Sequence, residues 1–392
     1  MTSVATATLE ESVPLYGLTR EQLDFREMIR TMVVERVEPR AAEIDAEGEF
    51  PQDIRELFAD HDIFGLPFAI EHDGTGTGEL MLCVAIEEIA KACASSALIL
   101  AVQDLSSLPI KLAGSEELKD RMLPRLASGE WLGAFALSEP EAGSDASAMR
   151  TRAERADGGW VLNGAKNWIT NASVADVYTV FAVTDRDVKP SRGISAFAVP
   201  ADSEGFRVDK LEHKMGMRGS PTGQPVFEDC FVPDENLIGE LNEGFKTAMR
   251  TLDRSRLGIA SQALGIAQGA TDYAAAYAKE RTAFGKPINQ LQGIQFKLAD
   301  METKTAAARE LLYRAAAKVE RSEPDLGKYS AMAKLFCSDT AMEVTVEAVQ
   351  VLGGFGYVNE YPVERMMRDA KLTQIYEGTN EIQRVVVARS LA

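Results

Sequence analysis

One carboxylate, Glu377, lies in a heptad whose other members could put it to chemical use. Residues 374–380 read QIYEGTN, with a glycine directly after the glutamate, and residues 381–388 follow with amphipathic helical spacing. Thr379 is a good helix N-cap, so the pattern predicts a carboxylate at a helix entrance. Free backbone N–H groups at such an entrance can bind an anion or a carbonyl oxygen. A solvated glutamate in a plain loop before a helix fits these seven residues as well.

The remaining reactive side chains favour carboxylate and cofactor chemistry over metal or histidine chemistry. Three histidines and four cysteines are scattered without metal-binding or CxxC spacing: His61, His72, His213, Cys83, Cys93, Cys230 and Cys337. This disfavours a metal site and a histidine-based nucleophile, and it suggests reduced, mostly buried thiols in a reducing compartment. We therefore expect no metal and a cytoplasmic location.

The composition is that of an ordinary globular protein with an acidic balance. The 392 residues are 45% hydrophobic and 26% charged, and the formal net charge is −18. This charge opposes nucleic acid and an anionic membrane face, so a phosphate-bearing ligand must meet a local basic cluster or helix N-termini. The longest purely apolar run, residues 97–102, is too short to span a bilayer, and residues 1–13 lack the pattern of a secretory signal. We expect neither membrane insertion nor a nucleic-acid partner.

Four places carry residues that a cofactor or a phosphate would explain. They are FALSEPEAGSD at 135–145, NWITN at 167–171, LDRSR at 252–256, and RTAFGK at 281–286 together with QVLGGFG at 350–356. The first two offer small residues, hydroxyls and a large ring, where a flat ring system and phosphates could approach closely. The third puts two arginines on a helix of an acidic protein. Taken singly, each also fits plain structure: barrel strands, a solvated helix face or a glycine C-cap.

The elements that must position these groups change type twice along the chain. Residues 1–130 show helical patterns, beginning with a capping box at Thr19 and Gln22, and predict an all-α N-terminal domain. Residues 131–243 carry short β-rich runs between turn signals, which indicates a small antiparallel barrel or sandwich. Residues 244–392 return to long alanine-rich helices, typical of a four-helix bundle. The predicted fold class is α+β, with an antiparallel β-barrel domain between two helical domains.

Seven motifs, in this order and at this spacing, resemble the acyl-CoA dehydrogenase family over nearly the whole chain. They are LSEPEAGSD (137–145), NWITN (167–171), DRSR (253–256), RTAFGKPI (281–288), QVLGGFGY (350–357), EYPVERMMRDAK (360–371) and IYEGTNEIQR (375–384). The resemblance implies the family fold and a homotetrameric flavoprotein that carries FAD. One departure is Glu141, where many members have glycine, and it concerns only the local backbone.

For the cofactor, the resemblance implies FAD between the β-domain and the bundle, partly contacted by a neighbouring subunit. Trp168 would shield one face of the ring, and Thr170 would hydrogen-bond near N5. The other residues on cofactor positions are Phe135, Leu137, Ser138, Ser144 and Ile169 in the first two motifs, Arg281, Phe284, Leu291, Gln292, Gln350, Val351, Gly353 and Gly354 across the subunit interface, and Thr379 and Asn380 near the pyrophosphate.

For the reaction, the resemblance implies α,β-dehydrogenation of an acyl-CoA thioester to the trans-2-enoyl-CoA. Glu377 falls on the position of the base that removes the α-proton, and flavin N5 would accept the hydride. The Glu377 N–H and an FAD ribityl hydroxyl would polarise the thioester carbonyl. Electrons would pass to electron-transfer flavoprotein. The residues on substrate positions are Ser144, Asp253, Arg254, Ser255, Arg256, Tyr376, Gly378 and Arg389.

Other functions and the acyl chain itself stay open. An acyl-CoA oxidase would pass electrons to oxygen, although its usual chains carry a further C-terminal domain, and a DNA-associated flavin-binding relative would need a basic surface. Residues 92–110, where the family places part of its acyl pocket, contain no lysine or arginine. We therefore prefer a short or branched aliphatic acyl chain to a dicarboxylic one, with medium chains still open. Fatty-acid β-oxidation or branched-chain amino-acid catabolism would be the pathway.

Overall fold

Helices form the first third of the chain. The computed structural model describes residues 17–391, so the expectation about a signal in residues 1–13 lies outside the described residues. α1 (Arg20–Met32) begins at the predicted capping box, in which Thr19 and Gln22 exchange side-chain and backbone hydrogen bonds. A π-turn and a 3-10 turn extend it, and α2 (Ala41–Glu47), α3 (Gln52–Asp60), α4 (Glu79–Ala90), α5 (Ala94–Ala113) and α6 (Glu116–Ala127) follow.

The middle of the chain is a nine-stranded sheet. Its strands are β1 (Gly133–Ala136), β2 (Arg152–Ala156), β3 (Gly159–Ala165), β4 (Ile169–Thr170), β5 (Val177–Val183), β6 (Ile194–Pro200), β7 (Phe206–Leu211), β8 (Thr222–Pro233) and β9 (Leu237–Ile238). The main path runs β4-β8-β3-β2-β5-β6-β9, while β1 pairs with β5 and β7 with β8. The buried aromatic side chains Tyr178, Phe197 and Phe227 fill the core of this domain.

The prediction of a purely antiparallel barrel is wrong in two pairings. β1 runs parallel to β5, in register from Gly133↔Val177 to Ala136↔Val180, and β2 meets β5 in parallel at Arg152↔Val183. The remaining pairings of the sheet are antiparallel, including the predicted β2–β3 hairpin. Short apolar runs do not specify which strand they pair with, because pairing is set by packing across the sheet.

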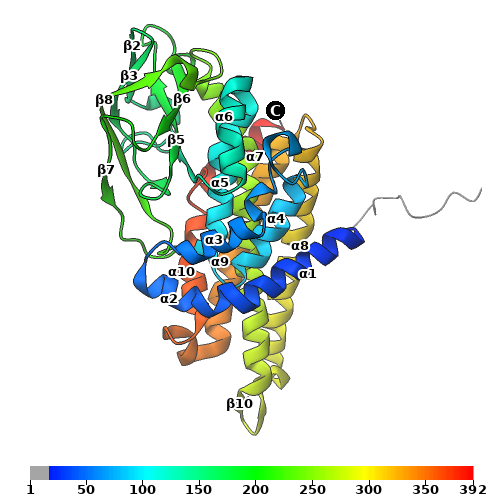
Figure 1. Cartoon of the computed structure of the whole chain (residues 1–392). Coiled ribbons are helices and arrows are strands. Elements are labelled where there is room, and N and C mark those ends of the chain that lie inside the picture. Colours follow the sequence, from blue (N-terminus) through cyan, green and yellow to red (C-terminus); the bar gives the residue numbers. More distant parts are fainter. Residues whose placement is uncertain (1–16, 392) are drawn as a thin grey trace, which may run out of the picture.

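Long helices return after the sheet. α7 (Gly244–Glu280), α8 (Gln292–Glu320) and α9 (Leu326–Leu352) are followed by the shorter α10 (Pro362–Thr373) and α11 (Asn380–Arg389), and the hairpin of β10 (Thr282–Ala283) and β11 (Lys286–Pro287) joins α7 to α8. In Figure 1 that hairpin forms the tip of the molecule opposite the sheet. The core between these helices is rich in alanine, which allows their backbones to approach closely.

The central helix α5 is long and apolar enough, by length and composition, to cross a membrane, yet it is a core helix here. Over its most apolar window 83% of the residues are buried inside the protein. A side-chain carbon added at Gly258 of α7 would lie 3.3 Å from Ala101, and one added at Gly133 of β1 would lie 2.1 Å from Ser106 Oγ. Glycines therefore let both α7 and the sheet pack directly against α5.

The sheet is held against the last helices by polar contacts at their common edge. The Met217 N–H, in the loop before β8, donates to Asp369 Oδ1 of α10 at 2.5 Å, and Arg368 Nη1 donates to the Met215 carbonyl at 2.9 Å. Burial raises the pKa of Asp369 to about 6. The order of a helical, a β and a second helical domain is confirmed.

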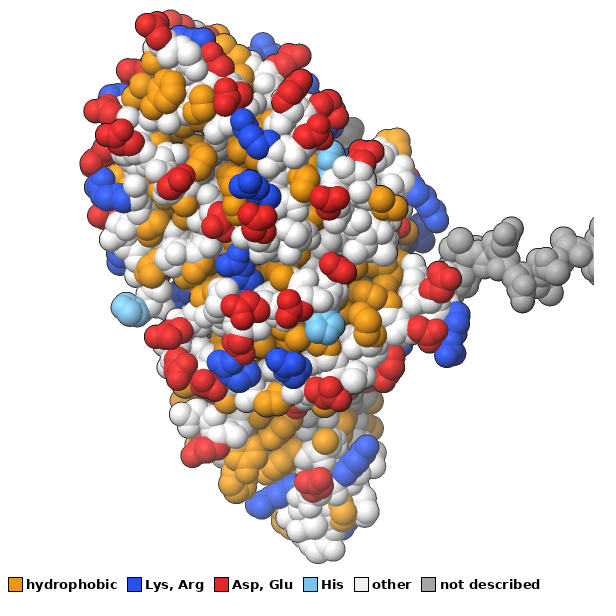
Figure 2. Space-filling model, in the orientation of Figure 1, with side chains coloured by type: hydrophobic (Ala, Val, Ile, Leu, Met, Phe, Trp, Pro, Cys, Tyr) orange, Lys and Arg blue, Asp and Glu red, His pale blue; other side chains and the backbone are white. Residues whose placement is uncertain are grey.

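Charged side chains of both signs are spread over the surface. Figure 2 shows acidic and basic side chains interspersed on one face, with hydrophobic side chains gathered between the body of the molecule and the hairpin tip. All four cysteines are free thiols and buried, as the sequence suggested. Within residues 17–391, no three His, Cys, Asp or Glu side chains are grouped to hold a metal ion.

Candidate active site

Glu377 lies in a tight left-handed turn at the entrance of α11. Its φ is +51°, and that of Gly378 is +90°. Thr379 then caps the helix by accepting a hydrogen bond from the Ile382 N–H, as predicted. A left-handed glutamate is uncommon and strained, so the surroundings must stabilise this conformation.

The N–H groups of the turn are free, whereas its carbonyl groups accept hydrogen bonds. Within residues 17–391, the N–H groups of Glu377, Gly378 and Thr379 donate to no backbone carbonyl. In contrast, Gln383 Nε2 donates to the carbonyls of Glu377, at 3.2 Å, and of Gly378, at 2.8 Å. Three neighbouring donors are thus available to an anion or to a polarised carbonyl oxygen.

Ser255 on α7 contacts the glutamate directly. Its hydroxyl donates to Glu377 Oε2 at 2.7 Å. Burial raises the pKa of Glu377 to about 8, although the hydrogen bond from Ser255 and the positive charges of Arg256 and Lys334 oppose that rise. A carboxyl with a pKa near the working pH suits a general base.

Three residues of α9 hold the turn from behind, and the motifs did not single them out. Lys334 is fully buried, and its Nζ donates to the Gly378 carbonyl at 2.8 Å and to Asn380 Oδ1 at 2.9 Å. Asn380 Nδ2 donates to Ser338 Oγ at 2.9 Å and to Asp339 Oδ1 at 2.7 Å. The Asn380 side chain is therefore engaged by α9, and its N–H donates to the Gln374 carbonyl at 3.0 Å.

The predicted arginine cluster lies on α7 within one turn of Ser255. Arg256 is only 4% exposed and its Nη1 donates to Asp253 Oδ1 at 2.8 Å, while its buried Nε has no partner in the described chain. Arg254 turns away from this pair, toward the Arg250 carbonyl. A buried guanidinium with a free donor is a binding group for a polar ligand.

Two more predicted substrate residues flank the turn at different distances. The Tyr376 hydroxyl donates to Gln262 Oε1 of α7, which fixes the chain just before Glu377. Arg389 is exposed in the last turn of α11. Since it follows Thr379 by almost the whole of a ten-residue helix, it lies about 15 Å along the axis from the turn.

The first two predicted cofactor motifs meet at the end of β1. The Asn167 N–H donates to the Ser138 carbonyl at 2.9 Å, so the NWITN segment runs beside Leu137 and Ser138. Trp168 has a φ of +62° and its side chain is 60% exposed. The others are placed as follows: Leu137 and Ile169 are buried, Phe135, Ser138 and Thr170 are partly buried, and Ser144 is exposed. An indole left open beside a strand end offers a flat apolar surface to a ring system.

A buried ion pair supports this strand end. Lys166 is fully buried, and its Nζ donates to Glu139 Oε1 at 2.8 Å and to the Leu137 carbonyl at 3.2 Å. Glu139 also accepts from the Arg150 and Thr151 N–H groups, at 2.6 and 3.0 Å. Burial lowers the pKa of Lys166 to about 8, whereas Lys166 and these N–H groups hold the pKa of Glu139 below its usual value.

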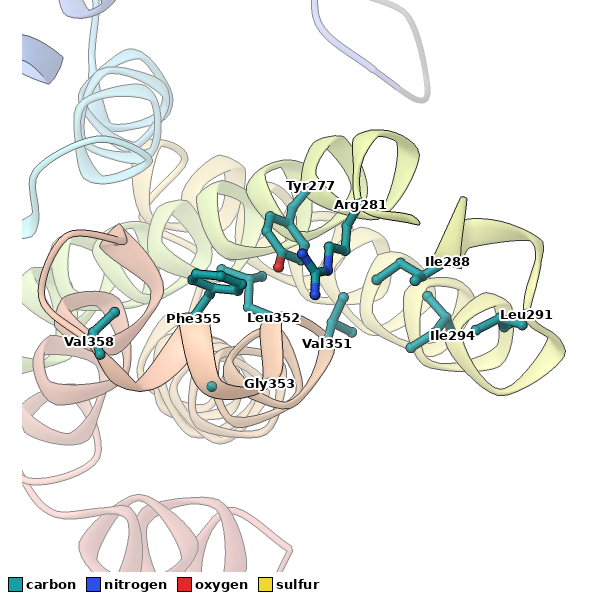
Figure 3. Close-up of a pocket in the computed structure, with 11 residues that line it drawn as sticks. Tyr277, Arg281, Ile288, Leu291, Ile294, Val351, Leu352, Gly353, Phe355 and Val358 are labelled. Atoms are coloured by element: carbon teal, nitrogen blue, oxygen red, sulfur yellow. The ribbon is translucent and has the colours of Figure 1, made fainter. Parts of the chain in front are cut away.

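The remaining predicted cofactor residues gather in a separate cleft near the hairpin tip. A cleft of about 570 Å³ is lined by Tyr277, Arg281, Ile288, Leu291, Ile294, Val351, Leu352, Gly353, Gly354, Phe355 and Val358. In Figure 3 the Arg281 side chain points between Tyr277 and Val351, toward the cleft. Phe284, at the hairpin, is 90% exposed, and Gln292 and Gln350 are exposed next to the lining residues. An added side-chain carbon at Gly353 or Gly354 would meet nothing within 4 Å.

The Glu377 turn and the cleft near the hairpin tip are far apart within one chain. Ser255, which contacts Glu377, and Arg281 lie at positions 255 and 281 of one continuous helical path, about 39 Å apart at 1.5 Å per residue. The Glu377 turn and the cleft of Figure 3 are therefore separate places on this molecule.

Sequence reasoning missed the buried supports of both motifs. A signal for Lys334 was present, because Ser330, Lys334, Cys337, Ser338 and Ala341 recur at helical spacing, and all five are buried. A lysine in such a stripe stands where a core residue is expected, so it needs an internal partner.

Comparisons with known proteins agree along the whole chain. Family models described as the N-terminal, middle and C-terminal domains of acyl-CoA dehydrogenase match residues 19–130, 134–230 and 242–392. A probable acyl-CoA dehydrogenase of Mycobacterium tuberculosis, FadE25, is 50% identical over 380 residues, which cover 97% of this chain and 97% of that protein.

Solved structures give the same picture in space. Butyryl-CoA dehydrogenase from Megasphaera elsdenii superposes with a TM-score of 0.93 at 44% identity, covering 96% of this chain and 99% of that one. A chain from a structure described as the electron transferring flavoprotein of Acidaminococcus fermentans superposes with a TM-score of 0.94 at 44% identity, with coverage of 96% and 99%.

Proposed function

Because this chain belongs to the acyl-CoA dehydrogenase family of oxidoreductases, we propose that it uses FAD to oxidise a short or branched acyl-CoA thioester, with Glu377 as the base. The observation that carries the proposal is the Glu377 turn. It combines a carboxyl whose pKa is raised to about 8 by burial with free N–H groups beside it. Such a pairing suits removal of a proton next to a carbonyl that is being polarised.

The residues present fit a flavin dinucleotide. Trp168 offers an open indole face beside the strand end of Leu137 and Ser138, and the free N–H groups of Gly378 and Thr379 can meet phosphate oxygens at the start of α11. When bound, the flavin supplies the acceptor for the hydride that leaves the substrate β-carbon. The protein's own task is to bind, orient and deprotonate the thioester.

Glu377 takes the α-proton in the proposed reaction. The electron pair of the α C–H bond becomes part of the new Cα=Cβ double bond, and the proton goes to the Glu377 carboxylate. The Glu377 N–H is the protein donor that can stabilise charge on the thioester oxygen, and such a donor typically contributes about 3–4 kcal/mol to the barrier. Ser255 keeps the carboxylate in place, because it donates to Oε2 at 2.7 Å.

The CoA portion is proposed to bind along α7. Arg256 keeps a buried, unpartnered Nε, and Asp253 fixes its orientation. For the acyl group, α5 offers an almost wholly buried wall in which Asp104 is already paired with Lys111 at 2.6 Å. No cation of this wall is left for a second carboxylate, which supports an aliphatic acyl chain. The butyryl-CoA dehydrogenase of M. elsdenii supports a short one.

A second copy of the chain is part of the proposal. The cleft of Figure 3 lies about 39 Å along α7 from Ser255, so its residues are remote from the Glu377 turn of the same chain. We therefore assign Arg281, Phe284 and their neighbours to the flavin of an adjoining subunit, in a homotetramer. Electron-transfer flavoprotein is the proposed electron acceptor, supported by the description of the A. fermentans structure.

Anaerobic titration tests the proposal. The purified yellow protein should lose its flavin colour when butyryl-CoA or isobutyryl-CoA is added, and Glu377→Gln should keep the flavin but lose nearly all of this bleaching. Glu381→Gln, in the exposed first turn of the same helix, is the matched control and should behave like the wild type. Normal bleaching by Glu377→Gln would refute the assignment of the base. Rapid reoxidation of the bleached wild type by air would favour an acyl-CoA oxidase instead.

A further inference from the structure

We propose that Lys334 is a positioning residue for the base: it holds the left-handed turn of Glu377 by two hydrogen bonds and adds a buried positive charge, beside that of Arg256, close to the turn. This inference rests on the proposed function, because it concerns how Glu377 is kept ready to accept a proton. Lys334 lies on α9, 43 positions before Glu377, and none of the sequence motifs includes it.

The geometry of the contact explains the clamping role. Gly378 is the second of two left-handed residues, and its carbonyl accepts hydrogen bonds from both Lys334 Nζ and Gln383 Nε2, each at 2.8 Å. Lys334 also donates to Asn380 Oδ1 at 2.9 Å. The lysine therefore bridges the residue after Glu377 to the first residue of α11. Because both acceptors directly follow Glu377, rotation of Glu377 out of its strained conformation would displace them from Lys334.

A lysine is an expensive choice for this place. Its side chain is fully buried, and an ammonium group loses most of its hydration there. Hydrogen bonds to a carbonyl and an amide oxygen could be made by a neutral donor such as glutamine. A buried cation is therefore better explained by a charge that it must balance than by the hydrogen bonds alone.

The charged groups around Lys334 leave Glu377 as the carboxylate that it balances. From α7 comes Arg256, which is a like charge. From α9 comes Asp339, whose carboxylate already accepts from Asn380, Gln374 and Arg384. From α11 comes Glu381, which is exposed. Burial lowers the pKa of Lys334 to about 7, and the charge of Glu377 is the largest of the influences that oppose this lowering.

The clamping role and the charge role of Lys334 predict different effects for two substitutions. Lys334→Met removes both the hydrogen bonds and the charge, whereas Lys334→Gln keeps a donor and removes only the charge. Loss of the charge should raise the pKa of Glu377, because an uncompensated carboxylate is harder to ionise in a buried site. The acid limb of the pH profile of kcat/KM, which reports groups of the free enzyme, should therefore move to higher pH in both variants.

The experiment compares wild type, both variants and Lys328→Met, a control at the start of the same helix. A shift of the acid limb by about one pH unit corresponds to about tenfold lower kcat/KM at pH 7. We expect this shift in Lys334→Gln, with kcat nearly restored at pH 9, and both the shift and a lower kcat at all pH values in Lys334→Met. Lys328→Met should match the wild type.

A second readout does not depend on turnover. Calorimetric titration with an unreactive thioether analogue of butyryl-CoA, in two buffers of different ionisation enthalpy, gives the number of protons taken up on binding at about pH 8.5, between the two expected pKa values of Glu377. The proton uptake should differ between wild type and Lys334→Gln, because Glu377 is more fully protonated beforehand in the variant. If Lys334→Met fails to retain flavin, Lys334→Gln still decides the question of charge.

Two outcomes overturn the inference. An acid limb and a proton uptake that are the same in Lys334→Gln as in wild type would reduce Lys334 to a structural residue. A kcat of Lys334→Met equal to that of wild type at pH 9 would refute the clamp. Failure of the proposed function looks different, since the wild type itself would then not be bleached by any acyl-CoA.

Discussion

Replacing Ser255 with alanine should make the active-site base harder to ionise without moving the backbone. The Ser255 hydroxyl donates to Glu377 Oε2 at 2.7 Å from a buried position on α7, in the middle of regular helix. Alanine is well accepted in a helix, so the substitution removes one hydrogen bond and little else. The carboxylate gains more from this bond than the neutral acid does, because the bond to the charged form is the stronger one.

The size of the effect follows from the strength of that bond. A hydrogen bond to a charged group contributes about 1.5–3 kcal/mol, and one pKa unit corresponds to about 1.4 kcal/mol. Because the protonated acid can keep part of the bond, we expect a rise of about one unit, from the pKa of about 8 in the wild type. At pH 7 the ionised fraction then falls from about a tenth to about a hundredth. The expected kcat/KM at pH 7 is about tenfold lower, and the difference should nearly vanish above pH 9.5.

The assay is the pH dependence of kcat/KM between pH 6 and 9.5, with an artificial electron acceptor in place of the natural partner. The pH dependence of kcat/KM reports ionisations of the substrate-free enzyme. Ser255→Thr is the matched control, because it keeps a hydroxyl at the same position of α7. The reasoning is refuted if the acid limb of Ser255→Ala coincides with that of wild type, or if Ser255→Thr shifts it as far as alanine does.

Three further predictions concern Lys166, Glu139 and Arg256. Lys166→Met should lower the free energy of unfolding by about 3–5 kcal/mol in urea titrations, because it leaves the Glu139 carboxylate buried without its cation. The double variant Lys166→Met/Glu139→Gln should recover most of this loss. Equal losses of unfolding free energy in the single and the double variant would contradict the prediction. Since the pKa of Glu139 is held below its usual value, the stability that Glu139 contributes is present above pH 4.5 and is lost as the pH falls below that. Arg256→Ala should raise KM for acyl-CoA about 10- to 100-fold with a smaller change in kcat, because it removes a buried charged donor. Arg256→Lys should recover part of the affinity, and unchanged saturation curves would exclude the proposed contact.

The sequence predicted correctly those features that depend on a few neighbouring residues. The capping box of Thr19 and the N-cap of Thr379 formed as predicted, because a side chain and an N–H three residues apart decide them. The strand positions were also anticipated from short β-rich runs, among them β5, which spans residues 177–183 as predicted. The exact domain boundaries at residues 130 and 243 stay predictions.

Partners distant in the chain were harder to infer. The parallel pairing of β1 with β5 depends on how the sheet packs against α5, about which the runs themselves carry no information. The same holds for Lys334 and Lys166, each of which reads as one more polar residue until the fold brings it to a carbonyl or a carboxylate. The family resemblance named residues that would touch ligands. The buried residues that support them were identified only in the structure.

The burial of α5 has a consequence for the way this protein is made. The helix ends at residue 113, but α7, whose Gly258 packs against it, begins only after residue 243. A growing chain therefore emerges from the ribosome with an apolar helix that lacks its native neighbour until the whole sheet and much of α7 have been synthesised. Closing so long a loop is slow, and exposed apolar surface invites aggregation in the meantime. The first helical domain is thus a distinct part of the architecture whose central helix is fully covered only when α7 has been made.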